Sequence, residues 1–253
     1  MTVKINTQRW CEGRVFDLKQ WTEKLFSIRV EADTLPFKAG QFTKLGLPFE
    51  DEFVERPYSY VNAPETSPHE FYFVTVPEGP LTNTMVTLKP GSPVGVMRRP
   101  SGFLVLDEVP AADHLWLMST GTGIGPFLSI LESNESWQRF QRIVLVHGVR
   151  LREELSYSER ISSISVRYPG QFDYVPFVSR EDADSAIRGR ITAGISDGRL
   201  ESRVGLKLSP DNCQVMLCGN PDMVSETSGL LEERGLARNR RRTPGHVTVE
   251  NYW

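Results

Sequence analysis

Residues 115–131 read LWLMSTGTGIGPFLSIL, and this stretch decides the fold of the second half of the chain. The apolar run 115–118 is typical of a buried strand, and the run 127–131 is typical of a helix. Between them stands the glycine turn Gly121-Thr122-Gly123-Ile124-Gly125-Pro126. Glycines let a backbone approach a phosphate, whose charge is favoured at the N-terminus of the next helix. The stretch predicts a strand, a nucleotide-binding turn and a helix; close packing alone is the alternative reason for the glycines.

Further apolar runs downstream alternate with stretches of helical pattern. The runs are His114 to Met118, Ile143 to Val146, Tyr174 to Val178 and Val215 to Leu217. Such alternation is typical of β-α-β units that build a parallel sheet. The pattern begins after Asp107-Glu108-Val109-Pro110. We therefore predict a domain boundary near residue 107, with domains at residues 1–106 and 107–253.

Residues 14–105 show a different pattern, of short β-rich runs broken by proline and glycine turns. The runs are Val15 to Leu18, Leu25 to Val30, Gln41 to Leu47, Tyr58 to Val61 and Glu70 to Val76. Short strands at this spacing predict an antiparallel β-barrel. A single helix is expected at Thr82 to Leu88, where Leu81, Met85 and Leu88 recur at helical spacing.

Cations follow two of the predicted parallel strands. Arg150 ends the second run, Ser179-Arg180 follows the third, and Arg190 stands shortly after it. An enzyme that uses NAD usually carries an acidic residue after the second strand, whereas arginine accommodates the 2′-phosphate of NADP. The pattern indicates a site for the 2′-phosphate; three arginines on a solvated rim are the alternative interpretation.

Composition excludes several classes of protein. The 253 residues carry a net charge of −3, which excludes a globally basic nucleic-acid binder. Three cysteines are too few for a disulfide framework or a four-cysteine iron-sulfur cluster, and the four histidines lack metal-ligand spacing. No run reaches the roughly 18 apolar residues of a membrane span, and we find no secretory signal. We expect a soluble, cytoplasmic protein without a bound metal.

Five segments together resemble a known family, the bacterial ferredoxin (flavodoxin)–NADP⁺ reductases. The segments are Arg56-Pro57-Tyr58-Ser59, the glycine turn, Val178-Ser179-Arg180-Glu181, Cys218-Gly219-Asn220-Pro221 and Val249-Glu250-Asn251-Tyr252-Trp253. They occur in the family's order across nearly the whole chain, and the final Tyr-Trp is most similar to the enterobacterial branch. The resemblance implies an FAD-binding barrel followed by an α/β domain for NADP(H).

The resemblance also implies roles in binding FAD. Arg56 would bind the pyrophosphate, Tyr58 would stack on the isoalloxazine and Ser59 would hydrogen-bond near its N5 atom. The remaining implied FAD contacts are Pro57, Tyr72, Phe73, Val74, Thr75, Pro80, Leu81, Thr82, Thr122, Tyr252 and Trp253. For the two terminal aromatic residues, ordinary packing of the last strand is the alternative.

For NADP, the resemblance implies two groups of residues. The adenosine 2′-phosphate would be bound by Arg150, Ser179, Arg180 and Arg190. The rest of the cofactor would lie along Gly121, Gly123, Gly125, Gly219, Asn220 and Pro221. Ser59 and Glu250 would manage the flavin N5 proton, and Cys218 would set the approach of the nicotinamide. NADPH would give a hydride to the flavin, and the flavin would release the two electrons one at a time.

A basic segment suggests the surface that meets the electron carrier. Residues 238–242 read RNRRR, and Arg98-Arg99 adds a second pair. Such charge steers an acidic partner, and the resemblance implies ferredoxin or flavodoxin. A solvated loop is the alternative. We expect a monomer that binds neither nucleic acid nor membrane.

Three other functions remain open from the sequence. Two share the fold: the reductase component of an oxygenase, and an NADPH-dependent reductase of free flavin or quinone. The third is a flavin-bearing sensor without turnover. A preference for NADH would indicate the oxygenase component. Reduction of excess free flavin would indicate the flavin or quinone reductase, and absence of NADPH oxidation would indicate the sensor.

Overall fold

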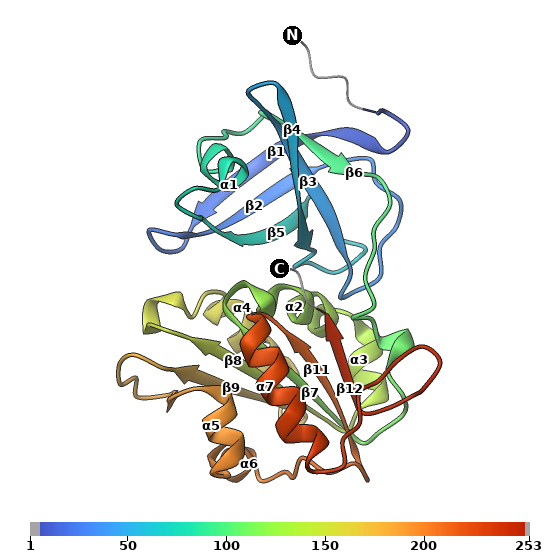
Figure 1. Ribbon diagram of the computed structural model, residues 1–253, viewed down its shortest axis with the longest axis vertical. Coiled ribbons are helices and arrows are strands. Elements are labelled where there is room, and N and C mark those ends of the chain that lie inside the picture. The colour runs from blue at the N-terminus through green and yellow to red at the C-terminus, as the bar shows by residue number, and fades with distance from the viewer. Residues whose placement is uncertain (1–5, 251–253) are drawn as a thin grey trace.

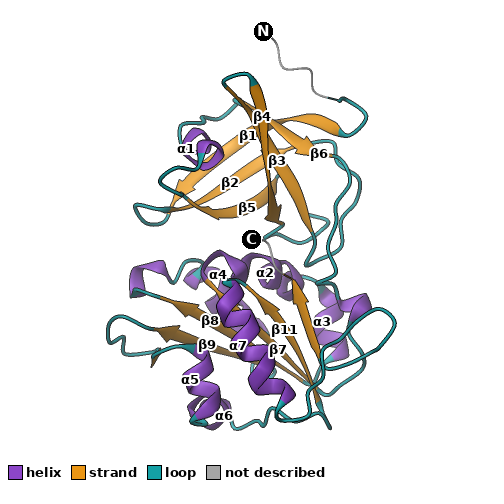
Figure 2. Ribbon diagram, in the orientation of Figure 1, coloured by secondary structure: helices purple, strands orange, loops and turns teal. Residues whose placement is uncertain are grey.

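The computed structural model describes residues 6–250 and contains two sheets, one above the other in Figure 1. We call residues 10–97, with β1–β6 and α1, the barrel half, and residues 114–250, with β7–β12 and α2–α7, the parallel half. Figure 2 shows that the barrel half is almost entirely strands, whereas helices cover the sheet of the parallel half. This is the predicted fold class, an antiparallel barrel followed by an α/β parallel sheet.

All strand pairs of the first sheet are antiparallel, in the order β4-β3-β6-β1-β2-β5. An isolated bridge between Tyr60 and Phe71 connects the chain after β4 to β5, so the two edges of the sheet meet. The strands are β1 (Trp10–Gln20), β2 (Leu25–Glu31), β3 (Phe42–Phe49), β4 (Glu52–Ser59), β5 (His69–Val74) and β6 (Pro93–Met97).

All strand pairs of the second sheet are parallel, in the order β10-β9-β8-β7-β11-β12. The carboxyl ends of its strands therefore share one edge, where open α/β sheets bind ligands. The strands are β7 (His114–Thr120), β8 (Arg142–Val149), β9 (Phe172–Val178), β10 (Ile187–Arg188), β11 (Cys213–Cys218) and β12 (Val247–Glu250).

Helices cover both faces of the second sheet. The helices are α2 (Gly125–Glu132), α3 (Asn134–Arg139), α4 (Ser158–Arg167), α5 (Ile191–Ser196), α6 (Arg199–Val204) and α7 (Pro221–Glu232). Residues of α2–α4 share one apolar core with one face of the sheet, and residues of α5–α7 share a second core with the other face. The first of these cores also contains Leu25, Val61 and Tyr72 of the barrel half. The two halves therefore pack against each other through apolar side chains.

Some boundaries differ from the predicted ones. Helix α1 spans Pro80–Met85, earlier than predicted, because Pro80 suits the first turn of a helix and Val86 is the C-cap. Strand β6 was missed, since it contains Pro93 and Gly95, both depleted in strands. Gly95 is required there: a Cβ would stand 2.6 Å from the Phe53 ring.

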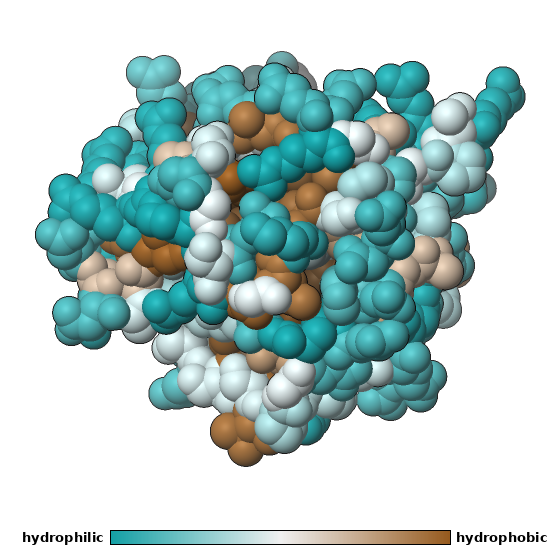
Figure 3. Space-filling model, turned by 90° about the horizontal axis from the view of Figure 1, so that it is seen from below, coloured by the Kyte–Doolittle hydropathy of each residue, from teal (hydrophilic) through white to brown (hydrophobic). Residues whose placement is uncertain are grey.

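The surface of the parallel half is mixed in polarity. Viewed from the end opposite the barrel half, hydrophilic side chains dominate and apolar residues show in patches between them (Figure 3). Within residues 6–250, every helix is too short or too polar to cross a membrane. The same residues contain no group of three or more His, Cys, Asp or Glu side chains placed to hold a metal ion.

Candidate functional site

The glycine turn lies directly against the end of β11. A Cβ at Gly123 would stand 2.6 Å from the carbonyl oxygen of Cys218 and 2.8 Å from the Cα of Gly219. Gly219 has φ +136, and a Cβ there would stand 2.3 Å from the Thr120 hydroxyl. Side chains are therefore excluded from the place where the ends of β7 and β11 meet. Bare backbone of this kind can follow the outline of a nucleotide.

Polar groups behind the turn hold it in place. The imidazole Nε2 of His147, on β8, is 3.1 Å from the carbonyl oxygen of Gly121. Burial lowers the pKa of His147 to about 4, so the ring is neutral at pH 7 and its N–H donates to that oxygen. The Thr120 hydroxyl accepts the backbone N–H of Asn220 at 2.9 Å. Sequence reasoning missed His147 and Thr120, although both flank the predicted strand ends.

The segment Arg56-Pro57-Tyr58-Ser59 ends β4 at the side of the parallel half. Arg56 is exposed, and within residues 6–250 its side chain makes one hydrogen bond, from Nη1 to the neighbouring Glu55 carbonyl at 2.7 Å. Tyr58 is half-buried with its ring 6.2 Å from that of Phe73, and burial raises the pKa of its phenol. The Cβ of Ser59 is 3.9 Å from where a Cβ of Gly125 would be. The structure thus brings the first motif and the glycine turn together.

The other residues predicted for FAD divide into buried and accessible ones. Tyr72 is buried and its hydroxyl donates to Ser156 at 2.8 Å, while Phe73 stacks on Phe26 in the barrel core. Val74 and Thr75 are half-exposed. Pro80, Leu81 and Thr82 form the first turn of α1, which packs against β3 and β4. Leu81 and Thr82 are buried in this turn, and Pro80 is half-exposed.

The predicted arginines converge at one edge of the second sheet. Val149 of β8 pairs with Val178 of β9, and Val178 pairs with Arg188 of β10. Arg150, Ser179 and Gly189 therefore follow neighbouring strands, about 4.8 Å apart, and the backbone N–H of Arg180 donates to the Arg150 carbonyl at 2.9 Å.

The guanidinium groups at this edge are available to an anion. Arg150, Arg180 and Arg190 are exposed and form no ion pair within the described residues, whereas Arg188 pairs with Asp182 at 2.7 Å. The nearby Glu154 carboxylate instead accepts the backbone N–H of Arg150 at 2.8 Å. A groove of about 910 Å³, lined by residues that include Leu151, Arg152 and Glu181, lies beside them.

The predicted catalytic residues lie on neighbouring elements. Cys218 and Glu250 are paired across β11 and β12, and Cys218 is fully buried. Burial, with the Glu250 carboxylate nearby, raises the pKa of the Cys218 thiol well above its ordinary value. The thiol is therefore protonated at neutral pH. The Glu250 carboxylate accepts the backbone N–H of Phe103 at 3.0 Å. Tyr252 and Trp253 lie outside the described residues.

The basic segment 238–242 lies in a loop between α7 and β12, which we call the basic loop; its four arginines are exposed, whereas Asn239 is buried. Arg241 is committed to structure, because its Nε is 3.4 Å from Glu108 and its guanidinium lies over the Phe103 ring at 5.5 Å. Arg240 and Arg242 are exposed and form no ion pair within residues 6–250. Their charge is therefore available to another molecule.

Two sets of residues at the adjoining ends of the two halves fit two elongated anionic ligands. One set, at the end of β4 and the start of α1, offers an unpaired guanidinium and a half-buried aromatic ring. The other, at the carboxyl edge of β7–β11, offers side-chain-free backbone and unpaired arginines. The sets adjoin where Ser59 meets Gly125. This arrangement can hold two cofactors so that their reactive ends meet.

Comparisons with known proteins extend over nearly the whole chain. A family model described as "Oxidoreductase NAD-binding domain" matches residues 117–229. A protein of Escherichia coli named flavodoxin/ferredoxin–NADP reductase is 48% identical over 245 residues, covering 96% of this chain and 99% of that protein. The ferredoxin–NADP reductase of Pseudomonas aeruginosa is 36% identical over 248 residues, covering 94% and 95% respectively.

Solved structures give the same picture. The crystal structure of a ferredoxin NADP⁺ reductase from Neisseria gonorrhoeae, with bound FAD and NADP, matches with a TM-score of 0.90 at 33% identity. The match covers 97% of this chain and 99% of that one. The similarity therefore includes both sheets and the place where they meet.

Proposed function

Because the chain belongs to the flavodoxin/ferredoxin–NADP reductases, we propose that it is an FAD-dependent oxidoreductase that passes electrons between NADPH and a one-electron carrier. The observation that carries this proposal is the contact between the two motifs: Ser59, at the end of the predicted flavin segment, lies beside Gly125 of the nucleotide turn. FAD, when bound, supplies the exchange between two-electron and one-electron chemistry. The protein itself must bind the two cofactors and orient their reactive ends.

On this proposal, the barrel half holds FAD. The Arg56 guanidinium has no carboxylate partner within the described residues and would pair with the pyrophosphate. The neutral ring of Tyr58 would stack on the isoalloxazine. Thr122 would approach the flavin from the glycine turn, and the first turn of α1 would complete the site.

The carboxyl edge of the second sheet would hold NADP(H). Arg150, Ser179, Arg180 and Arg190 would bind the 2′-phosphate by charge-assisted hydrogen bonds. The backbone at Gly123 and Gly219, followed by Asn220 and Pro221, would lie along the nicotinamide half, since side chains are excluded there. The division of the chain near residue 107 would then separate the two binding functions.

Three residues would serve the reacting ends of the cofactors. The Ser59 hydroxyl would hydrogen-bond near N5, and the Glu250 carboxylate, held by the Phe103 backbone N–H, would exchange the proton. The protonated thiol of Cys218 would set how closely the nicotinamide approaches. Tyr252 and Trp253 would cover the flavin from the C-terminal end.

We propose that the carrier is an acidic ferredoxin or flavodoxin, steered by the exposed basic loop. We further propose a cytoplasmic monomer that binds no nucleic acid. The test is a coupled assay in which the FAD-loaded protein, NADPH and increasing carrier reduce cytochrome c. Turnover that saturates with ferredoxin or flavodoxin supports the proposal. Faster turnover with free flavin or quinone, preference for NADH, or absence of NADPH oxidation would each favour one of the alternative functions.

A further inference from the structure

One face of α2 follows residues 59–63 of the barrel half. Gly125, Ser129 and Glu132 stand at positions i, i+4 and i+7, so they share this face. Gly125 lies at the end of the helix that meets Ser59. In the middle of the helix, the Ser129 hydroxyl donates to the carbonyl of Asn62 at 2.7 Å. The helix that begins at the glycine turn is thus fastened to the barrel along its length.

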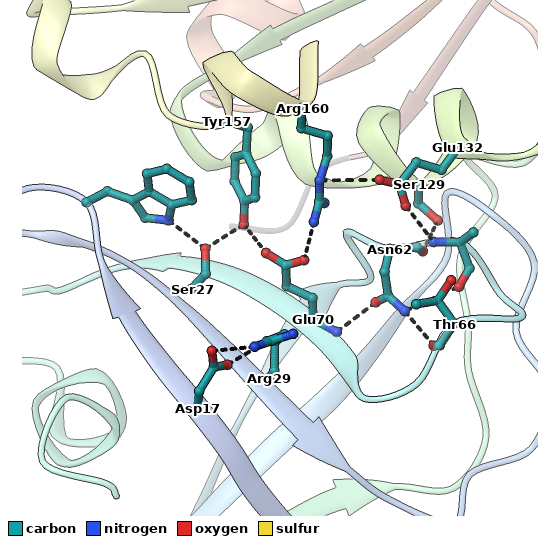
Figure 4. A network of polar contacts seen from close by, with 12 residues as sticks. Asp17, Ser27, Arg29, Asn62, Thr66, Glu70, Ser129, Glu132, Tyr157 and Arg160 are labelled. Atoms are coloured by element: carbon teal, nitrogen blue, oxygen red, sulfur yellow. Dashed lines mark hydrogen bonds and ion pairs between the residues drawn. The ribbon is translucent and has the colours of Figure 1, made fainter. Parts of the chain in front are cut away.

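The C-terminal end of α2 is held by charged groups, drawn in Figure 4. The Glu132 carboxylate accepts the backbone N–H of Ala63 at 3.1 Å and pairs with Arg160 Nε of α4 at 3.3 Å. Arg160 Nη2 also donates to Glu70 of β5 at 2.7 Å. Arg160 therefore connects one carboxylate of the parallel half with one of the barrel half. We call Glu70, Glu132 and Arg160 the clamp.

The clamp takes its members from both halves, and Glu70 of the barrel half is its most deeply buried member. Glu70 is only 7% exposed, and its second carboxylate oxygen accepts the Tyr157 hydroxyl of the parallel half at 2.9 Å. Burial disfavours the charge of Arg160, but Glu70 and Glu132 outweigh it and raise the pKa of Arg160. Removing Arg160 would leave the buried Glu70 carboxylate without its ion-pair partner.

Water reaches one side of the clamp. A groove of about 340 Å³, whose lining includes Trp21, Glu70 and Arg160, opens beside it. A partly hydrated ion pair contributes little to overall stability, but its directional bonds fix how its elements lie relative to each other. The clamp is therefore suited to fixing the position of α2 relative to the barrel half.

We propose that Arg160 is a positioning residue for hydride transfer: by joining Glu70 to Glu132 it holds α2 against residues 59–63 and so fixes the glycine turn beside Ser59. This inference rests on the proposed function. Helix α2 is about 12 Å long, and its N-terminal end bears the nucleotide turn while its C-terminal end bears Glu132. A tilt caused by loss of the clamp would shift the turn relative to the barrel. Hydride transfer is sensitive to such shifts, since about 1 Å of misplacement costs about a hundredfold in rate.

The experiment compares Arg160→Met, Arg160→Lys and Glu132→Gln with the control Arg167→Met. Arg167 lies on the same helix and is exposed, and the contact recorded for its guanidinium is with the neighbouring Tyr168 ring. Three properties are measured on the FAD-loaded proteins: amide hydrogen exchange in α2, the rate of flavin reduction by saturating NADPH, and the Kd of NADP⁺.

We expect Arg160→Met to speed exchange in α2 and to slow flavin reduction by about ten- to a hundredfold, with the Kd of NADP⁺ changed less than about twofold. Arg160→Lys, which keeps the charge, should recover part of the rate, and Arg167→Met should match the wild type. If Arg160→Met does not fold, Glu132→Gln is compared with the wild type instead, because it weakens the ion pair between Glu132 and Arg160 and leaves Arg160 paired with Glu70.

Unchanged exchange in α2 together with an unchanged rate would overturn the proposal. So would a loss of NADP⁺ affinity in proportion to the loss of rate, because that would make Arg160 a binding residue. Failure of the proposed function is distinguishable, since the wild type itself would then not be reduced by NADPH. The exchange measurement would still test the clamp.

Discussion

The backbone of Gly123 lies against that of Cys218, so that a Cβ at Gly123 would stand 2.6 Å from the Cys218 carbonyl oxygen. The obstacle is the backbone at the end of β11, which cannot rotate away as a side chain could. We expect Gly123→Ala to lower the free energy of unfolding by about 1–3 kcal/mol, the usual cost of overpacking, and to weaken binding of NADP⁺. Urea denaturation and a Kd measurement check both effects.

Gly125→Ala is the matched control for stability. Its Cβ would meet Val61 Cγ2 at 3.4 Å, an ordinary contact, and the residue begins a helix, where alanine is favoured over glycine. We expect this variant to be as stable as the wild type or slightly more so. Equal destabilisation by the two substitutions would show that the contact between Gly123 and Cys218 is not special.

The arginines at the carboxyl edge should decide between NADPH and NADH. A hydrogen bond to a charged group contributes about 1.5–3 kcal/mol, so Arg180→Ala or Arg190→Ala should weaken NADP⁺ binding about ten- to a hundredfold. NAD⁺ lacks the 2′-phosphate and its binding should hardly change. Arg188→Ala, which removes a residue paired with Asp182, is the control. If the affinities for NADP⁺ and NAD⁺ fell in proportion, these arginines would belong to a solvated rim and would not bind the 2′-phosphate.

Within the basic loop, the structure separates two kinds of arginine. We expect Arg240→Glu with Arg242→Glu to slow carrier reduction and to flatten its dependence on salt, while ferricyanide reduction is unchanged, because only steering is lost. Arg241→Ala should instead lower the melting temperature, since Arg241 contacts Glu108 and Phe103. Stopped-flow rates at several ionic strengths test the first effect. Equal slowing with both acceptors would argue against a carrier surface.

His147 should make stability depend on pH. Its pKa is lowered from 6.5 to about 4 in the folded chain. Above pH 6.5 the ring is neutral in the folded and in the unfolded chain, so its full contribution to the free energy of unfolding is present. As the pH falls towards 4, the unfolded chain takes up the proton first, and this stabilising contribution is lost. The loss amounts to about 3 kcal/mol. His147→Gln should show a flatter curve of unfolding free energy between pH 6.5 and 4, and identical slopes would refute this assignment.

The sequence allowed prediction of those motifs whose residues are contiguous in the chain. The glycine turn, the arginines after the strands and the Arg56 to Ser59 segment were visible because strand ends and turns have local patterns, and the parallel register then fixes where they meet. The clamp was not predictable in this way. Arg160 and Glu70 are 90 residues apart and belong to no motif, and their contact follows from the packing of the two halves. The position of His147 beneath the turn follows from the parallel pairing of β7 with β8, in which Ser119 is paired with His147.

Rapid mixing of the FAD-loaded protein with NADPH or NADH, without oxygen, measures hydride transfer to the flavin before any carrier is involved. We predict that NADPH bleaches the flavin absorbance within milliseconds to seconds and that NADH does so far more slowly. Adding oxidised ferredoxin or flavodoxin should then restore the absorbance. A protein that retains no FAD after reconstitution, or whose flavin is reduced equally well by both nucleotides, would contradict the proposed function.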